Sequence, residues 1–159
     1  MTLNPDYFDM FKILNTADVR YLVVGGYAFG FHVEPRTTKD LDIWVDPSPE
    51  NVHLLYKALA EFGAPLAGVT EEDFRNPDLV YQIGVPPNRI DIMMGLENIT
   101  FDEAWKNRYE TTYTEEKVYV VSRDDLITIK RAAGRPQDLE DVRGLESSPK
   151  FAHPKKSTD

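Results

Sequence analysis

Short apolar runs alternate along this chain with longer segments of helical periodicity, a pattern typical of helices packed against a sheet. The apolar stretch 21–24 and the largely apolar stretch 40–46 predict two buried strands. Residues 79–84 and 89–94 predict two more strands, and the short turn between them predicts an antiparallel hairpin. A further strand is predicted at 117–121. The pattern therefore predicts strands and helices that alternate along one chain.

Capping residues and glycines mark where the predicted helices begin and end. Ser48 and Pro49 begin the most clearly amphipathic helix, and Gly63 ends it. Thr100 and Glu103 form a capping box at the start of another helix. The predicted helices span about residues 5–15, 27–31, 49–62, 101–107, 123–133 and 136–145, with one further helical turn at 71–75.

The composition fits one folded domain. The chain has 159 residues, 42% of them hydrophobic, so it can bury a core and is too apolar to be disordered. We expect one domain over residues 1–146 and a flexible C-terminal tail over residues 147–159, where polar residues and prolines gather. The absence of cysteine excludes a disulfide framework and a thiolate zinc site. No signal peptide or bilayer-spanning apolar run is present, so we expect a cytoplasmic protein without a membrane partner.

The charge balance narrows the choice of partners. A formal net charge of −9 argues against broad, nonspecific binding of nucleic acid, which depends on a basic surface. A local basic patch stays open as an interpretation. Its candidate residues are Arg36, Lys39, Arg89, Lys130, Arg131 and Arg135.

The residues with the clearest chemistry lie between positions 25 and 42. Gly25 and Gly26 follow a predicted strand, where a backbone without side chains lets phosphate oxygens approach N–H groups. Asp40 and Asp42 lie in the next predicted strand, whose two-residue period places both on one side with Cα atoms about 6.5 Å apart. Two carboxylates at that spacing can bind one hard cation. The combination predicts metal-assisted nucleotide chemistry.

Asp91 is the third acidic candidate. Alternation along residues 89–94 places Asp91 on the same face as Arg89, within a strand that is otherwise largely apolar. An aspartate in such a strand is costly unless it is paired or binds a metal. If this strand neighbours that of Asp40 and Asp42, three carboxylates meet, and they can hold two Mg²⁺ ions.

These motifs resemble the signature of the DNA polymerase beta-like nucleotidyltransferase superfamily. The resemblance is nearest to its small bacterial and archaeal members, which include abortive-infection enzymes and nucleotidyltransferase toxins. It extends over about residues 20–145 and rests on Gly25-Gly26, Arg36-x-Thr38-x-Asp40-Leu41-Asp42, Asp91 and Lys130-x-x-Ala133-x-Arg135-x-x-Asp138-x-x-Asp141. The resemblance implies an α/β (α+β) fold with a mixed, twisted sheet flanked by helices.

The resemblance also implies a role for each matching residue. Asp40 and Asp42 match the paired metal ligands, and Asp91 matches the third carboxylate, which serves as a general base or a second-metal ligand. The residues implied to bind the nucleotide or its phosphates are Gly25, Gly26, Arg36, Thr38, Lys39 and Lys130.

Alternatives remain open for the charged residues. Arg36 can equally brace its loop by pairing with a carboxylate, and Lys130 can face solvent or pair with Asp138. For Asp138 and Asp141 we favour structural ion pairs with Arg131 or Arg135.

The activity implied by the resemblance is transfer of a nucleoside monophosphate from an NTP to a hydroxyl group, with release of pyrophosphate and with Mg²⁺ or Mn²⁺ as the cofactor. The acceptor could be a protein, a tRNA or a small molecule. The alternative function is a catalytically silent nucleotide-binding or antitoxin-like module, against which the intact set of three aspartates argues. A third hypothesis is that a helical partner protein or a second copy of the chain completes the acceptor site.

Overall fold

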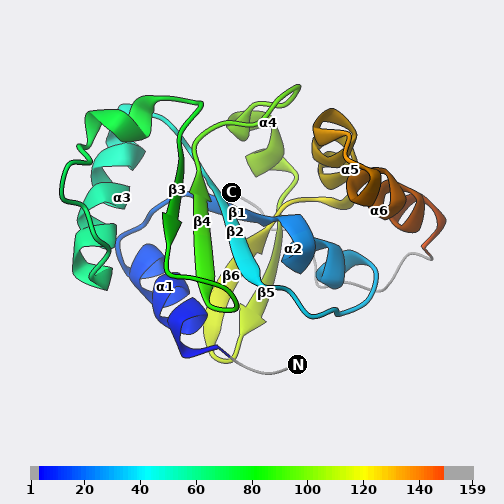
Figure 1. Ribbon diagram of the computed structural model, residues 1–159, viewed down its shortest axis with the longest axis horizontal. Helices are drawn as coiled ribbons and strands as arrows, with labels where there is room; N and C mark the ends of the chain where they lie inside the picture. Colours follow the sequence, from blue (N-terminus) through cyan, green and yellow to red (C-terminus); the bar gives the residue numbers. More distant parts are fainter. Residues whose placement is uncertain (1–3, 149–159) are drawn as a thin grey trace.

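The computed structural model describes residues 4–148 and shows a central sheet with helices on both sides (Figure 1). The strands are β1 (Tyr21–Val24), β2 (Asp40–Val45), β3 (Val80–Ile83), β4 (Arg89–Met93), β5 (Tyr109–Tyr113) and β6 (Glu116–Val120). The helices are α1 (Pro5–Thr16), α2 (Gly25–His32), α3 (Pro49–Phe62), α4 (Phe101–Lys106), α5 (Arg123–Ala133) and α6 (Pro136–Ser147), with a 3-10 turn η1 (Glu72–Arg75).

The sheet is mixed, as predicted. Within residues 4–148 its strand order is β3-β4-β2-β1-β6-β5. Strand β2 pairs in parallel with β4, and β1 pairs in parallel with β6. The neighbours β1 and β2, β3 and β4, and β5 and β6 are antiparallel, which confirms the predicted β3–β4 hairpin.

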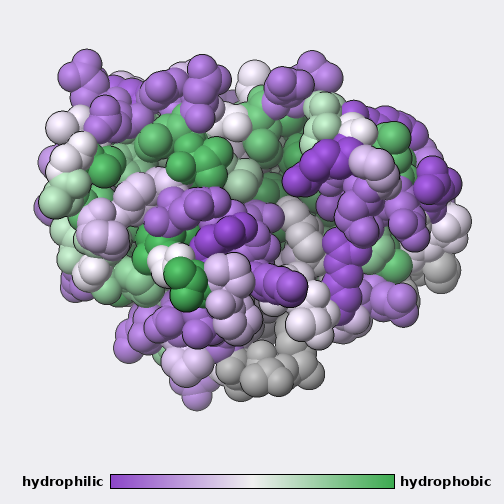
Figure 2. All heavy atoms as spheres, in the orientation of Figure 1, coloured by the Kyte–Doolittle hydropathy of each residue, from purple (hydrophilic) through white to green (hydrophobic). Residues whose placement is uncertain are grey.

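The central strands are buried because helices cover both faces of the sheet. Helices α1 and α3 lie on one side, and α2, α5 and α6 lie on the other (Figure 1). Every residue of β1 is buried, as is the apolar part of β2, where Trp44 is 1% exposed. Burial on both faces explains why these two strands read as nearly continuous apolar runs. Figure 2 shows mostly hydrophilic side chains on the visible surface, with smaller hydrophobic areas between them.

Most of the predicted helix starts are confirmed. The Thr100 side chain accepts from the N–H of Glu103, and their capping box is complete. The hydroxyl of Ser122 caps α5 by accepting from the N–H of Asp125. Ser48 occupies the cap position of α3, but the prediction that its side chain caps the helix is wrong. The Asp46 carboxylate makes the local hydrogen bond there, accepting from the backbone N–H of Ser48.

Strand β5 has no counterpart among the predictions. It pairs with β6 from Tyr109 opposite Val120 to Tyr113 opposite Glu116. Its middle residues are Glu and Thr, and it lies at the edge of the sheet, so its sequence carries no apolar run. The predicted tail lies outside the described residues, apart from its first two positions. No helix in the described part of the chain is both long and apolar enough to cross a bilayer.

Candidate active site

Asp40 and Asp42 from β2 and Asp91 from β4 form one group of carboxylates, the acidic cluster. Because β2 and β4 pair in parallel, Asp42 lies opposite Asp91 and Asp40 lies opposite Arg89. One carboxylate oxygen from each of the three residues lies within 4.8 Å of the other two. The predicted meeting of these three side chains is therefore confirmed, while their chemical roles stay predictions.

Asp42 and Asp91 ionise less readily than exposed aspartates. Burial, reinforced by the negative charges of Asp40 and Asp91, raises the pKa of Asp42 to about 7. Burial also raises the pKa of Asp91, although the charge of Arg89 opposes that change. A cation bound between the carboxylates would relieve the repulsion. Since carboxylate oxygens are preferred ligands of hard divalent cations, the acidic cluster fits Mg²⁺ or Mn²⁺.

Arg89 supplies positive charge at the acidic cluster. Its Nη2 lies 2.7 Å from Oδ2 of Asp40, and its Nε lies 3.0 Å from Oδ1 of Asp91. The two-residue period predicted that Arg89 and Asp91 share a face, but it did not identify Arg89 as the partner of Asp40. That pairing depends on the register between β2 and β4.

Gly25 and Gly26 form the first turn of α2, beside the acidic cluster. Gly25 has a φ of +69°, and a Cβ there would lie 2.1 Å from Oδ2 of Asp42. A Cβ at Gly26 would lie 2.9 Å from Cγ2 of Thr38. The glycines therefore make room for side chains of β2 and of the loop before it. No side chain caps this end of α2, and an uncapped helix N-terminus attracts anions such as phosphate.

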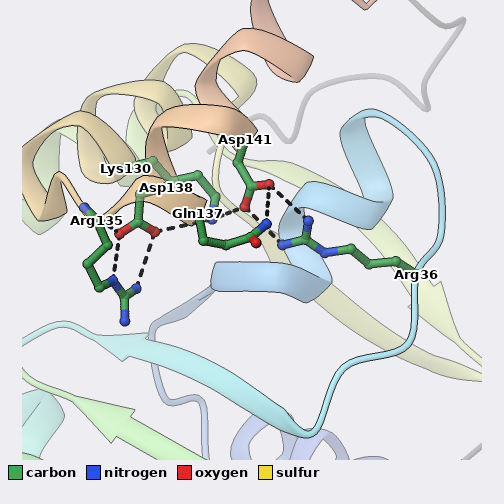
Figure 3. Close-up of polar contacts among 6 residues, drawn as sticks. All are labelled: Arg36, Lys130, Arg135, Gln137, Asp138 and Asp141. Atoms are coloured by element: carbon green, nitrogen blue, oxygen red, sulfur yellow. Dashed lines mark hydrogen bonds and ion pairs between the residues drawn. The ribbon is translucent and has the colours of Figure 1, made fainter.

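A second polar group ties the loop before β2 to α5 and α6 (Figure 3). We call it the Asp141 cluster, and it consists of Arg36, Lys130, Gln137 and Asp141. Nη1 and Nη2 of Arg36 each donate to Asp141 at 2.9 Å. Lys130 Nζ donates to the same carboxylate at 2.9 Å, and Gln137 Nε2 at 3.0 Å. The interpretation that Arg36 braces its loop against a carboxylate is thus confirmed.

The contacts of Lys130 and Asp141 confirm one alternative and correct one prediction. Lys130 is 6% exposed, and its Nζ lies 2.9 Å from Asp141 and 3.9 Å from Asp138, which confirms the alternative that Lys130 pairs with Asp138. The contact between Lys130 and phosphate that the resemblance implies stays a prediction. Asp141 pairs with Arg36 and Lys130, and the prediction that it pairs with Arg131 or Arg135 is wrong. Arg36 lies 105 positions from Asp141 in sequence, so spacing within one helix could not reveal this partner.

Arg135 and Lys39 are the exposed cations near the candidate site. Nε of Arg135 lies 2.6 Å from Oδ2 of Asp138, which confirms the predicted pairing of Asp138. Figure 3 shows the Arg135 side chain extending from the start of α6 towards β2. Its pKa is raised, first by the hydrogen bond to Asp138 and further by the charges of Asp42 and Asp40. Lys39 is exposed and directly precedes Asp40.

The raised pKa of Asp42 predicts that neutralising this residue stabilises the protein when no divalent cation is present. An unfolded Asp42 ionises near its ordinary pKa of 3.8, whereas the folded residue ionises near pH 7. The folded state therefore loses stability as pH rises between those values. We expect Asp42→Asn to raise the free energy of unfolding by about 2–4 kcal/mol at pH 8 and by less at pH 5. Urea denaturation in EDTA measures both values, and a variant less stable than wild type at pH 8 would contradict the prediction.

Comparisons with known proteins identify the family and the fold. A family model described as "Nucleotidyltransferase of unknown function (DUF6036)" matches residues 7–148. A search of curated proteins found no match. Among solved structures, the lincosamide antibiotic adenylyltransferase LnuA with bound lincomycin is 15% identical, with a TM-score of 0.57 over 92% of this chain and 99% of that chain.

Two further solved structures are similar. A putative nucleotidyltransferase (TM1012) from Thermotoga maritima is 16% identical, with a TM-score of 0.57 over 89% of this chain and 93% of that chain. ANT(2″)-Ia in complex with adenylyl-2″-tobramycin is 13% identical, with a TM-score of 0.55 over 87% of this chain and 84% of that chain. At such identities the likeness shows a shared fold.

Proposed function

Since the chain belongs to this family of nucleotidyltransferases, we propose that it transfers a nucleoside monophosphate from an NTP to a hydroxyl group and releases pyrophosphate. The observation that carries the proposal is the acidic cluster, which lies directly beside the uncapped first turn of α2. Carboxylates for a cation and backbone N–H groups for phosphate are the two parts that such a reaction needs. Their presence together supports catalysis over the silent nucleotide-binding module.

Each residue of the site has a task in the proposed reaction. Asp40 and Asp42 would hold Mg²⁺ or Mn²⁺, which would neutralise phosphate charge and make the acceptor hydroxyl easier to deprotonate. The N–H groups of Gly25 and Gly26 bind phosphate oxygens at the start of α2. Catalysis then consists mainly of positioning and charge neutralisation.

Asp91 is the proposed general base. Burial raises its pKa, which makes its carboxylate a better proton acceptor than an exposed aspartate. It takes the proton of the acceptor hydroxyl while that oxygen attacks the α-phosphorus in line with the departing pyrophosphate. Arg135 and Lys39 are the proposed partners of the triphosphate, because both are exposed cations near the acidic cluster. Arg36 braces the loop between α2 and β2.

We also propose that the acceptor is a small molecule. The compounds named for two of the structural neighbours, lincomycin and adenylyl-tobramycin, are small molecules. The hypothesis that a partner protein or a second copy of the chain completes the site stays a prediction, which light scattering at several concentrations can test.

Labelled nucleotides test the proposed reaction and its need for a metal. The purified protein is incubated with each NTP, radiolabelled at the α-phosphate, with Mg²⁺ and a cell extract as the source of acceptors. We expect one acceptor to become labelled, pyrophosphate to be released in equal amount, and EDTA to abolish both signals. An NTP labelled at the γ-phosphate is the control, because that phosphate leaves with pyrophosphate. Labelling of the acceptor from the γ-phosphate would overturn the proposal, since it would indicate a kinase.

A further inference from the structure

We propose that a tyrosine-lined cavity next to the acidic cluster binds the acceptor, and that this acceptor is an uncharged small molecule with a flat ring and a hydroxyl group. The inference rests on the proposed transfer reaction and adds the chemical class of its second substrate. Three points support it: the position of the cavity, the charge of its lining, and the direction from which the acceptor must approach the α-phosphorus for in-line transfer.

The cavity has a volume of about 510 Å³ and lies where α1, the loop before β2 and the β3–β4 turn meet. Tyr7 from α1, Tyr27 from α2 and Tyr113 from β5 contribute aromatic rings to its lining. Tyr7 and Tyr113 are 5% and 3% exposed, so they border the cavity with a small part of their surface, whereas Tyr27 is partly exposed. A cavity of this volume is within the usual range for small-molecule sites.

Tyr7 connects the cavity to the acidic cluster. Its hydroxyl donates to the carbonyl oxygen of Pro87 at 3.1 Å and lies 3.5 Å from that of Arg89, whose side chain contacts the acidic cluster. Burial, followed by the charges of the three aspartates, raises the pKa of Tyr7 to about 12. Thr38, another lining residue, lies two positions before Asp40. The three aspartates do not line the cavity themselves, but Tyr7 and Thr38 place it beside them, so a hydroxyl group of a bound molecule can face the carboxylates.

The lining selects against charged molecules. Among the described residues that line the cavity, Arg36 alone carries a charge, and Asp141 holds both of its terminal nitrogens. A polycation thus finds no carboxylate in the lining, and a triphosphate finds no free cation there. The polar part of the lining is uncharged: Asn4 Nδ2 donates to Asn88 Oδ1 at 2.8 Å, and Thr37 adds an exposed hydroxyl group. The partly exposed ring of Tyr27 is the one available to stack on a flat ring.

In-line transfer places the acceptor and the pyrophosphate on opposite sides of the α-phosphorus. The triphosphate is drawn towards Arg135 of α6, whereas the cavity is lined by α1, the loop before β2 and the β3–β4 turn, so the two substrates meet the acidic cluster from different elements. The acceptor oxygen forms a bond to the α-phosphorus as the bond to the bridging oxygen of pyrophosphate breaks. The proton of the hydroxyl passes to Asp91.

Benzyl alcohol is a probe for this site, with its para-aminomethyl and para-carboxylate derivatives as cationic and anionic controls. Protein with isotope-labelled tyrosine is titrated with each compound, without NTP, and the tyrosine ring signals are followed by NMR. We expect the uncharged alcohol to shift the signals of Tyr7, Tyr27 and Tyr113 and the charged compounds to bind at least about tenfold more weakly. The shifts should persist when a non-hydrolysable α,β-methylene NTP and Mg²⁺ are also present.

A substitution that fills the cavity tests the location. Thr37 is an exposed lining residue, so Thr37→Trp should weaken binding of benzyl alcohol at least about tenfold without disturbing the core. Glu34→Trp, in the same loop but outside the lining, should bind as wild type does and is the matched control.

The inference is overturned if no compound shifts the tyrosine signals, if a charged derivative binds as well as the alcohol, or if the NTP analogue displaces the alcohol. Displacement would assign the cavity to the donor nucleotide. If the label is transferred to an acceptor but the alcohol does not bind, the inference about the cavity is wrong and the proposed reaction stands. Alcohol binding without label transfer to any acceptor would count against the proposed reaction and leave the binding chemistry of the cavity in place.

Discussion

Replacing Asp42 with asparagine should lower the rate of label transfer at least about 1000-fold, which corresponds to about 4 kcal/mol of transition-state stabilisation. Asparagine keeps the shape of the side chain and removes the charge that a cation requires. The loss should occur without unfolding, because the pKa of Asp42 shows that its ionised form is disfavoured in the folded protein. Pyrophosphate release and transfer of the α-phosphate label, measured side by side, give the rate.

Asp124→Asn is the matched control for Asp42→Asn. It removes one negative charge from an exposed position in the first turn of α5, away from the acidic cluster. We expect Asp124→Asn to retain at least half of the wild-type activity, by the general behaviour of surface substitutions. Equal pyrophosphate signals from wild type and Asp42→Asn would contradict the proposed reaction and favour the silent nucleotide-binding module.

Replacing Asp141 with asparagine should lower the free energy of unfolding by about 3–5 kcal/mol. Asp141 is 3% exposed and accepts hydrogen bonds from Arg36, Lys130 and Gln137. Burial alone would raise its pKa, but the hydrogen bonds and charges of Arg36 and Lys130 lower it to about 2. Asparagine would leave the buried ammonium of Lys130 without its nearest carboxylate. Urea denaturation at neutral pH measures the loss.

Two other variants show whether this loss belongs to the Asp141 cluster. Glu140→Gln changes the exposed neighbour on α6 and should stay within about 0.5 kcal/mol of wild type. Lys130→Met should cost less than Asp141→Asn, because Asp141 keeps its contacts with Arg36 and Gln137. A loss below about 1 kcal/mol for Asp141→Asn would contradict a structural role for this cluster.

Local patterns predicted most of the elements correctly because the signals that define them are local. Strands β1 and β2 are buried on both faces and therefore read as apolar runs. Helix α4 begins at a complete capping box, and helix α5 ends at Gly134, which has a φ of +68°. Strand β5 was not predicted because its own residues lack an apolar pattern. Its pairing with β6 holds it in the sheet.

The candidate site likewise has features that local spacing predicted and features that depend on contacts between distant residues. The two-residue period of a strand predicted that Asp40 and Asp42 lie on the same face of β2. The position of Asp91 beside them could be predicted on the one condition that β4 is the neighbour of β2 in the sheet. The pairing of Arg36 and Lys130 with Asp141 could not be predicted, because the three residues come from three separate elements. The tyrosine-lined cavity combines residues from five segments of the chain, and no spacing along the sequence indicates it.

The sequence by itself therefore determined the family, the alternation of strands and helices, and the three carboxylates with their glycine pair. These features depend on residue identity and on periods of a few positions, which the chain carries in linear form. The tertiary structure alone decided which cation meets which carboxylate, what fills the space beside each glycine, and where a second substrate can bind. Those outcomes depend on strand register and helix packing, which bring together residues that lie far apart along the chain.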